Sequence, residues 1–249
     1  MSEKPVEGQS TPTHNNGLPL RGQFCVRLFP TVARMSSLIF YTDASQALVA
    51  TDTLAVKPGG APLMFCSKAI YLPHMRTIIA GTGLGMFAGD WANYVNNRLI
   101  VAGLRNLDHH TPDGLRTLWT HAKERDDIPN SITTTVYQIG VSEDDGEVRA
   151  FAYRSTNDFE SEPLGHGTRA KPECAFPSEG HLLHHLQPMM IEQRAIQDAK
   201  PPDDRLYIGG ECVVMHLTKE TCAISTLFRF EDYADQLAEI FGRFQKGAG

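Results

Sequence analysis

The sequence predicts an α+β protein in which two stacked antiparallel sheets lie between layers of helices. Two observations support this class. Segments with strand-like and helix-like patterns come in groups rather than in strict alternation, and turn-forming residues join neighbouring strand-like segments. Grouped strands with short connections favour antiparallel pairing, and grouped helices then cover the outer faces of the sheets. A chain of 249 residues suffices for one such domain with a substantial core.

The expected strands are short runs rich in β-branched and aromatic residues, bounded by turn-forming residues. In chain order they are residues 37–42, 47–56, 67–73, 76–83, 131–141, 147–155, 206–217 and 222–230. The first two, joined by the turn sequence DASQ, are predicted to form a hairpin. We expect a loop at Gly59–Pro62 and a Gly/Pro-rich connection at residues 162–173.

Four segments carry helical patterns: residues 85–104, a segment beginning at Thr111, residues 178–199 and residues 231–244. In the first of these, apolar side chains recur every four positions and form one face of a helix: Phe87, Trp91, Val95 and Leu99. The second is predicted from its start, because a Thr cap, a Pro in the first turn and an acid near the positive end of the helix dipole all favour a helix N-terminus. This places His109 and His110 in the preceding loop.

The composition excludes several classes of function. The chain has 41% hydrophobic residues, 21% charged residues and a formal net charge of −6. An acidic chain without clustered Lys and Arg is unsuited to binding nucleic acid. No segment approaches the roughly 20 apolar residues of a membrane span, and no secretory signal is recognisable. Five dispersed cysteines indicate reduced thiols. We therefore expect a cytoplasmic protein without nucleic-acid or membrane partners.

Three residues with complementary chemistry are evenly spaced near the start of the expected domain. Ser36, Asp52 and Lys68 are separated by two intervals of 16 residues, and each lies at an end of an expected strand. If Ser36 were the first residue of the mature chain, its α-amine, with a pKa of about 8, would act as a general base for its own hydroxyl. Lys68 would favour the alkoxide, and Asp52 would keep Lys68 charged and oriented. The alternative is an exposed serine, a turn aspartate and a surface lysine.

The strand context of these residues resembles the opening of proteasome β-type subunits and of the bacterial peptidase HslV. The resemblance is carried by SSLIFYTDASQALVATDTLAV, then SKAIYLP, then IIAGTG leading into a helix, and its element order extends over residues 36–245. In those N-terminal nucleophile (Ntn) hydrolases a terminal Thr, an Asp and a Lys have the same two separations. The resemblance therefore implies that Ser36, Asp52 and Lys68 are catalytic, and it implies a four-layer αββα sandwich that assembles into rings or stacked homo-oligomers.

The resemblance also implies an oxyanion donor, a backbone N–H of a glycine that follows the fourth strand. The sequence AGTGLG offers Gly81 and Gly83, and Gly81 preserves the family's Ala-Gly pair. Alternatively, both glycines simply allow a tight turn from strand to helix. His181 and His185 have the spacing of metal ligands on a helix, but no Glu of an HExxH motif accompanies them. We therefore expect a solvated helix face there, and no metal or other cofactor.

The sequence departs from the family's pattern at the candidate nucleophile. Ser36 stands where proteasomal peptidases have Thr, and Met35 stands where self-processing members have Gly. Residues 1–35 are expected to be an N-terminal extension, either a disordered tail, a propeptide or a mis-assigned start, and residues 36–249 a single domain. If translation began at Met35, methionine removal would expose Ser36 directly.

The function predicted from the sequence is that of a proteasome-like Ntn hydrolase, which cleaves an amide or peptide bond once Ser36 is exposed. Its expected partners are a peptide or small amide substrate and further copies of the chain in a homo-oligomer. Two alternatives stay open. One is a non-catalytic structural subunit in which residues 23–35 are packed and Ser36 stays internal. The other is a small-molecule amidase or acyltransferase on the same fold.

Overall fold

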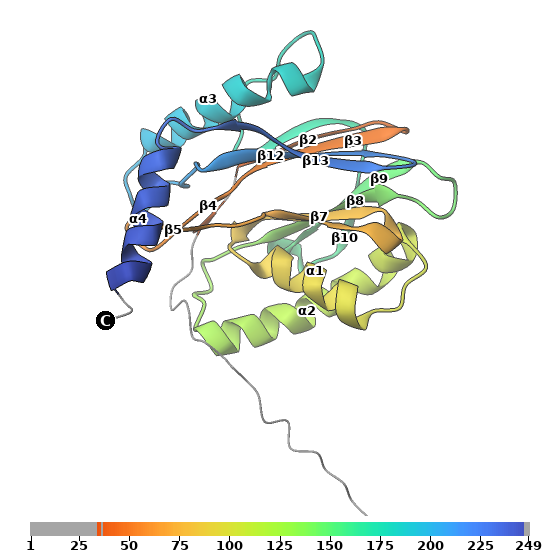
Figure 1. The fold of residues 1–249 in the computed structure, drawn as a ribbon. Helices are drawn as coiled ribbons and strands as arrows, with labels where there is room; N and C mark the ends of the chain where they lie inside the picture. The colour runs from red at the N-terminus through yellow and green to blue at the C-terminus, as the bar shows by residue number, and fades with distance from the viewer. Residues whose placement is uncertain (1–33, 36, 247–249) are drawn as a thin grey trace, which may run out of the picture. The chain divides into compact units, whose positions relative to one another are not determined.

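The computed structural model describes residues 34–35 and 37–246, and the fold is given for these residues alone. The candidate nucleophile Ser36 and nearly all of the expected extension, residues 1–35, lie outside the described residues. The described part of the chain has a mixed α+β fold with antiparallel sheets and four α-helices (Figure 1), which confirms the predicted α+β class and the antiparallel pairing of its strands.

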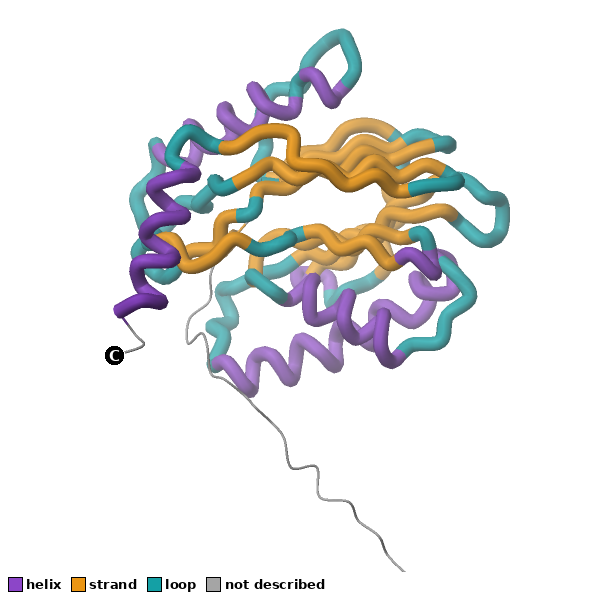
Figure 2. Tube along the Cα trace, in the orientation of Figure 1, coloured by secondary structure: helices purple, strands orange, loops and turns teal. Residues whose placement is uncertain are grey.

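Two larger antiparallel sheets, visible as two groups of strands in Figure 2, form the centre of the fold. The six-stranded sheet has the order β1-β7-β8-β9-β10, and β6 also pairs with β7. Its strands are Arg34–Met35 (β1), Ala69–Leu72 (β6), Thr77–Leu84 (β7), Thr135–Val141 (β8), Val148–Arg154 (β9) and Ser161–Leu164 (β10).

The five-stranded sheet has the order β11-β2-β3-β12-β13. Its strands are Leu38–Thr42 (β2), Gln46–Asp52 (β3), Gly167–Lys171 (β11), Glu211–Thr218 (β12) and Cys222–Arg229 (β13). A two-stranded hairpin, Leu54–Val56 (β4) and Pro62–Phe65 (β5), follows β3. The predicted hairpin of the first two strands is confirmed, with Leu38 opposite Thr51 and Thr42 opposite Ala47.

The α-helices are Phe87–Arg98 (α1), Leu104–Asp126 (α2), Leu186–Asp198 (α3) and Tyr233–Lys246 (α4), and 3₁₀ turns occur at Pro73–Met75, Ser155–Asn157 and Leu182–His184. In Figure 1, α1 and α2 cover the six-stranded sheet, whereas α3 covers the five-stranded sheet. α4 packs against β5.

Three clusters of buried side chains hold these elements together. One lies between the two larger sheets and includes Phe40 from β2 and Ile139 from β8. A second joins α1 and α2 to the six-stranded sheet, with Trp91 fully buried in it. The third joins α3 to the five-stranded sheet through side chains such as Met190. Each large apolar side chain buried in this way contributes about 1.5–3 kcal/mol.

The prediction for the start of the second helix is wrong. α2 begins at Leu104 rather than at Thr111, so His109 and His110 are helical. Pro112 lies inside the helix, where it has no N–H to donate to the carbonyl four residues earlier. The Thr111 hydroxyl is buried and donates to the carbonyl four residues before it, at 2.7 Å. A sequence typical of a helix start is therefore accommodated in a helix interior.

A carboxylate from a distant turn caps α2 instead. Glu143, between β8 and β9, accepts hydrogen bonds from the backbone N–H groups of Arg105 at 2.9 Å and Asn106 at 2.7 Å. A helix N-terminus leaves such N–H groups without intrahelical partners, and its dipole favours a negative charge. Burial acts to raise the pKa of Glu143, but the hydrogen bonds from the helix outweigh it and hold that pKa below its usual value. Because Glu143 is distant from α2 in the sequence, no local sequence pattern predicts that it caps this helix.

Three other segment predictions need correction. The connection at residues 162–173 contains most of β10 and all of β11, the loop at Gly59–Pro62 ends in the first residue of β5, and α3 begins at Leu186 rather than at residue 178. Pairing with existing strands explains β10 and β11, because β10 joins the edge of β9 and β11 joins the edge of β2. Such pairing overrides weak local strand propensity.

Candidate functional site

The structure brings Asp52 and Lys68 into direct contact. Asp52 is the last residue of β3 in the five-stranded sheet, and Lys68 immediately precedes β6 in the six-stranded sheet. Lys68 Nζ donates to Asp52 Oδ1 at 2.7 Å, and the two side chains are 4% and 0% exposed. Taking such charges out of water costs several kcal/mol for each ion, so a pair at this depth requires good geometry and further hydrogen bonds.

Two backbone N–H groups complete the environment of the Asp52 carboxylate. Ser37 donates its N–H to Oδ1 at 2.9 Å, and Gly209 donates its N–H to Oδ2 at 3.1 Å. Both carboxylate oxygens are therefore engaged, and the side chain is fixed in one orientation. The lysine ammonium is held in turn at the junction of the two sheets.

The residues on either side of position 36 lie beside this pair and beside β7. Ser37 is buried and contacts Asp52, as described above. Met35 belongs to β1 and pairs with Gly83 of β7. Ser36 itself lies outside the described residues, so its contacts with Asp52 and Lys68 stay a prediction.

Both candidate oxyanion glycines lie on β7, and both have a packing reason to lack a side chain. Gly83 has a φ of +95°, and a Cβ there would overlap the backbone oxygen of Thr133. A Cβ on Gly81 would lie 2.5 Å from the Cβ of Ala88 on α1. These contacts are in keeping with the alternative interpretation, in which the glycines permit the close turn from strand to helix.

Two cysteine thiols lie near the ion pair. Burial raises the pKa of Cys66, and the charge of Lys68 only partly opposes this effect. Burial, with the charge of Asp52, raises the pKa of Cys212 to about 12. Because the thiolate is the nucleophilic form, the raised pKa makes each thiol less reactive at neutral pH than a free cysteine.

Sequence reasoning missed three residues of this site. Ser37 and Gly209 act through backbone N–H groups, which carry no side-chain signal. Gln193 on α3 is fully buried, and its Oε1 accepts a hydrogen bond from the Ser37 hydroxyl. The Gly209–Gly210 pair before β12 was the one visible hint, since paired glycines often mark a close approach of backbone to another group.

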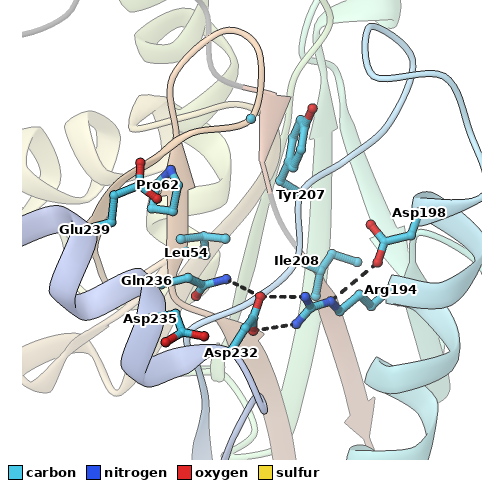
Figure 3. Close-up of a pocket in the computed structure, with 11 residues that line it drawn as sticks. Leu54, Pro62, Arg194, Asp198, Tyr207, Ile208, Asp232, Asp235, Gln236 and Glu239 are labelled. Carbon is cyan, nitrogen blue, oxygen red and sulfur yellow. Dashed lines mark hydrogen bonds and ion pairs between the residues drawn. The ribbon is translucent and has the colours of Figure 1, made fainter.

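A separate cavity of about 300 Å³ opens between α3, α4 and the β4–β5 hairpin (Figure 3). Arg194 makes two hydrogen bonds to the Asp232 carboxylate, at 2.8 and 2.6 Å. Gln236 donates to the same carboxylate at 2.8 Å and accepts from the Gly210 N–H at 3.1 Å. The residue before Gly210 is the one that donates to Asp52 Oδ2, so this polar chain ends beside the ion pair. The cavity is also lined by Leu54, Gly60, Pro62, Asp198, Tyr207, Ile208, Asp235 and Glu239.

The two histidines with ligand spacing do not share an α-helical face. His181 precedes the 3₁₀ turn at Leu182–His184, and His185 precedes α3. Within residues 37–243, no group of three or more His, Cys, Asp or Glu side chains has an arrangement that could hold a metal ion. Among the described residues, no helix combines the length and the apolar content required to cross a lipid bilayer.

Solved structures with a similar fold include Anbu proteins. Anbu (ancestral beta-subunit) from Yersinia bercovieri matches with a TM-score of 0.52 and 13% identity, over 85% of this chain and 94% of that chain. Anbu from Hyphomicrobium sp. strain MC1 matches with a TM-score of 0.51 and 11% identity, over 85% of this chain and 96% of that chain. No protein-family model and no curated protein matches the sequence. At this identity the likeness shows the fold alone, which is proteasome-related.

These comparisons correct the family suggested by the sequence. The resemblance to proteasome β-type subunits and HslV is not supported by any family model or curated relative. The structural neighbours are Anbu proteins, which are proteasome-like but distinct from those two groups. The shared order of strands and helices explains the misassignment, because a common fold keeps that order after the sequences have diverged.

Proposed function

We propose that this protein is an Ntn-type hydrolase that cleaves an amide or peptide bond with Ser36, once Ser36 is the first residue of the chain. One observation carries the proposal: the buried Lys68–Asp52 pair is held by the N–H of Ser37, the residue next to Ser36. A buried ion pair adds little stability compared with apolar side chains of similar size. Its presence beside a candidate nucleophile therefore favours a functional role.

In the proposed reaction the Ser36 α-amine accepts the proton of the Ser36 hydroxyl while the oxygen attacks the carbonyl carbon. Lys68 stabilises the developing negative charge, and Asp52 keeps the ammonium in place. The oxyanion is bound by the backbone N–H of Gly81 or Gly83. The leaving amine then takes the proton from the α-ammonium, which leaves an ester on Ser36. Water activated by the same amine hydrolyses that ester and restores the hydroxyl.

The proposal includes the finer organisation of the chain. Residues 36–249 would form a single domain with a four-layer αββα sandwich, and residues 1–35 an N-terminal extension. The separation of the buried side chains into three clusters supports four layers, since each cluster joins two neighbouring layers. The proposed setting is cytoplasmic, with a peptide or small amide as substrate and further copies of the chain as partners. The proteasome-related fold supports this assembly.

The test begins with protein purified from its native host. Intact mass and N-terminal sequencing should show a chain that starts at Ser36. A β-lactone, which acylates hydroxyl nucleophiles, should label the wild type and should not label Ser36→Ala. Lys68→Met should slow labelling by roughly 10²–10⁴-fold, whereas the same change at the exposed Lys57 should not. Labelling that survives Ser36→Ala would refute the proposal.

A different observation favours a second candidate function, that of a non-catalytic structural subunit. Residues Arg34–Met35 form β1 and pair with Leu84 and Gly83 of β7, so the described end of the extension belongs to the six-stranded sheet. A chain that keeps this strand has the Ser36 nitrogen in a peptide bond, and that nitrogen cannot act as a base. Native protein that retains residues 1–35 would support the structural subunit and exclude the hydrolase.

A further inference from the structure

Ser37, the residue after the candidate nucleophile, is fixed at two points. Its N–H donates to Asp52 Oδ1 at 2.9 Å, and its hydroxyl donates to Gln193 Oε1. Ser37 and Gln193 are both 0% exposed, so no solvent competes for these bonds. The Ser37 backbone nitrogen, which links Ser36 to the rest of the chain, is therefore held by the Asp52 carboxylate that also pairs with Lys68.

Gln193 is itself held in one orientation. It lies on α3, and its Nε2 donates to the Pro172 carbonyl just after β11. Exchanging the amide nitrogen and oxygen would set the amide oxygen against that carbonyl oxygen. Gln193 is 0% exposed, and Met189 and Met190 on the same helix belong to the cluster between α3 and the five-stranded sheet. An amide at such a position is costly unless both of its polar groups are bonded.

We propose that Gln193 is a positioning residue for the candidate nucleophile. It fixes the Ser37 side chain, and Ser37, which directly precedes β2 and contacts Asp52 at the end of β3, in turn sets the direction in which the chain leaves the start of β2 toward residue 36. The inference rests on the proposed function of Ser36 and deepens it, because it adds a contact from α3 to a site otherwise built from strands. Holding a reacting group in the productive geometry is worth orders of magnitude in rate.

The same helix offers a matched control. Gln197 lies one turn after Gln193, is 1% exposed, and accepts the Leu206 N–H through Oε1 at 3.1 Å. Gln193→Leu and Gln197→Leu therefore each remove one buried amide from α3. Both variants should unfold at lower temperature than the wild type, whereas only Gln193→Leu loses the contact to Ser37.

The experiment measures β-lactone acylation of Ser36 in native-host protein whose N-terminus has been verified by mass. Gln193→Leu should lower the maximal acylation rate by about 10- to 100-fold, with the half-saturating lactone concentration unchanged. Gln197→Leu should change that rate by less than about twofold, a change typical of a site without contact to the reacting group. A purely structural role would lower both rates alike.

A double-mutant cycle isolates the contact. Ser37→Ala alone should slow acylation, and adding Gln193→Leu should slow it little further, because the two side chains act as one unit. Additive effects, or a Gln193→Leu rate equal to that of Gln197→Leu, would overturn the inference and leave the proposed function standing. Labelling of Ser36→Ala at the wild-type rate would refute both proposals together.

Discussion

Replacing Lys68 by Met tests the buried ion pair at its centre. The change keeps an unbranched side chain of similar length but leaves the Asp52 carboxylate, 0% exposed, without its counter-ion. Breaking a buried pair in this way costs about 3–5 kcal/mol. Two of the three donors to Asp52, the N–H groups of Ser37 and Gly209, remain in place. We therefore expect the lower end of that range, about 3 kcal/mol, or a fall in Tm of roughly 6–12 °C for a domain of this size.

Urea unfolding followed by tryptophan fluorescence measures this loss. Trp91 is 0% exposed in the cluster beneath α1 and α2, so its emission reports loss of the core. Lys57→Met is the matched control, because Lys57 is exposed and the same substitution should change stability by no more than about 0.5 kcal/mol.

A double-mutant cycle of Asp52→Asn and Lys68→Met tests whether the two buried charges depend on each other. In Asp52→Asn/Lys68→Met neither buried charge is left alone, so the double variant should lose less stability than the two single losses combined. If Lys68→Met were as stable as Lys57→Met, the Asp52 carboxylate would not be the buried, charged group that the geometry describes. The role proposed for Asp52 would then fail as well.

Other positions test the fold more widely. Gly83→Ala should cost about 1–3 kcal/mol, since its φ is positive and an added Cβ overlaps a backbone oxygen, whereas Gly89→Ala inside α1 should stabilise by about 0.5–1 kcal/mol in parallel thermal melts. Glu143→Gln should cost about 0.5–1 kcal/mol at pH 7, because the cap is largely exposed. The pKa of Glu143 is lowered in the folded state, so its contribution is present above the unfolded pKa and lost as pH falls through the folded pKa; the melts should converge in acid. Asp232→Asn should show the same convergence in urea titrations, since the hydrogen bond from Arg194 lowers the pKa of Asp232. A Gly83→Ala protein as stable as the wild type, or a deficit that grows in acid, would contradict these assignments.

Local patterns were sufficient for the parts of the fold that depend on near neighbours. The first hairpin follows from two apolar runs and the turn sequence between them, in which Asp43 Oδ1 accepts the N–H of Ser45 at 2.7 Å and the N–H of Gln46 at 3.0 Å. The apolar face of α1 follows from the four-residue spacing that buries Phe87 and Trp91. In both cases the interacting groups lie within a few residues of one another.

The errors arose where the deciding contact is distant. The start of α2 depends on Glu143, which is 38 residues from Arg105, and the strand β11 depends on pairing with β2. Without those partners, Thr111-Pro112-Asp113 is a better helix start than Leu104, and the Gly/Pro-rich connection has no reason to form strands.

The candidate site likewise combines residues that the sequence pattern predicted with residues that it could not predict. The spacing of Asp52 and Lys68 pointed to residues that the fold brings within 2.7 Å of each other, although they come from different sheets. Spacing could not reveal Gln193 or Gly209, because Gln193 contacts Ser37 from 156 residues away and Gly209 acts through its backbone. The role of Ser36 stays a prediction.

Asp52 couples the stability of this region to its proposed chemistry. Its three donors come from the start of β2, from the residue before β6 and from the segment before β12, so any change at Asp52 loosens three parts of the chain at once. Loss of activity in an Asp52 variant would therefore not separate a catalytic role from a structural one. Ser36→Ala leaves all three donors in place, and Gln193→Leu leaves the ion pair intact. Changes at these two positions, compared at equal folded fraction, distinguish a hydrolase from a structural subunit with the same fold.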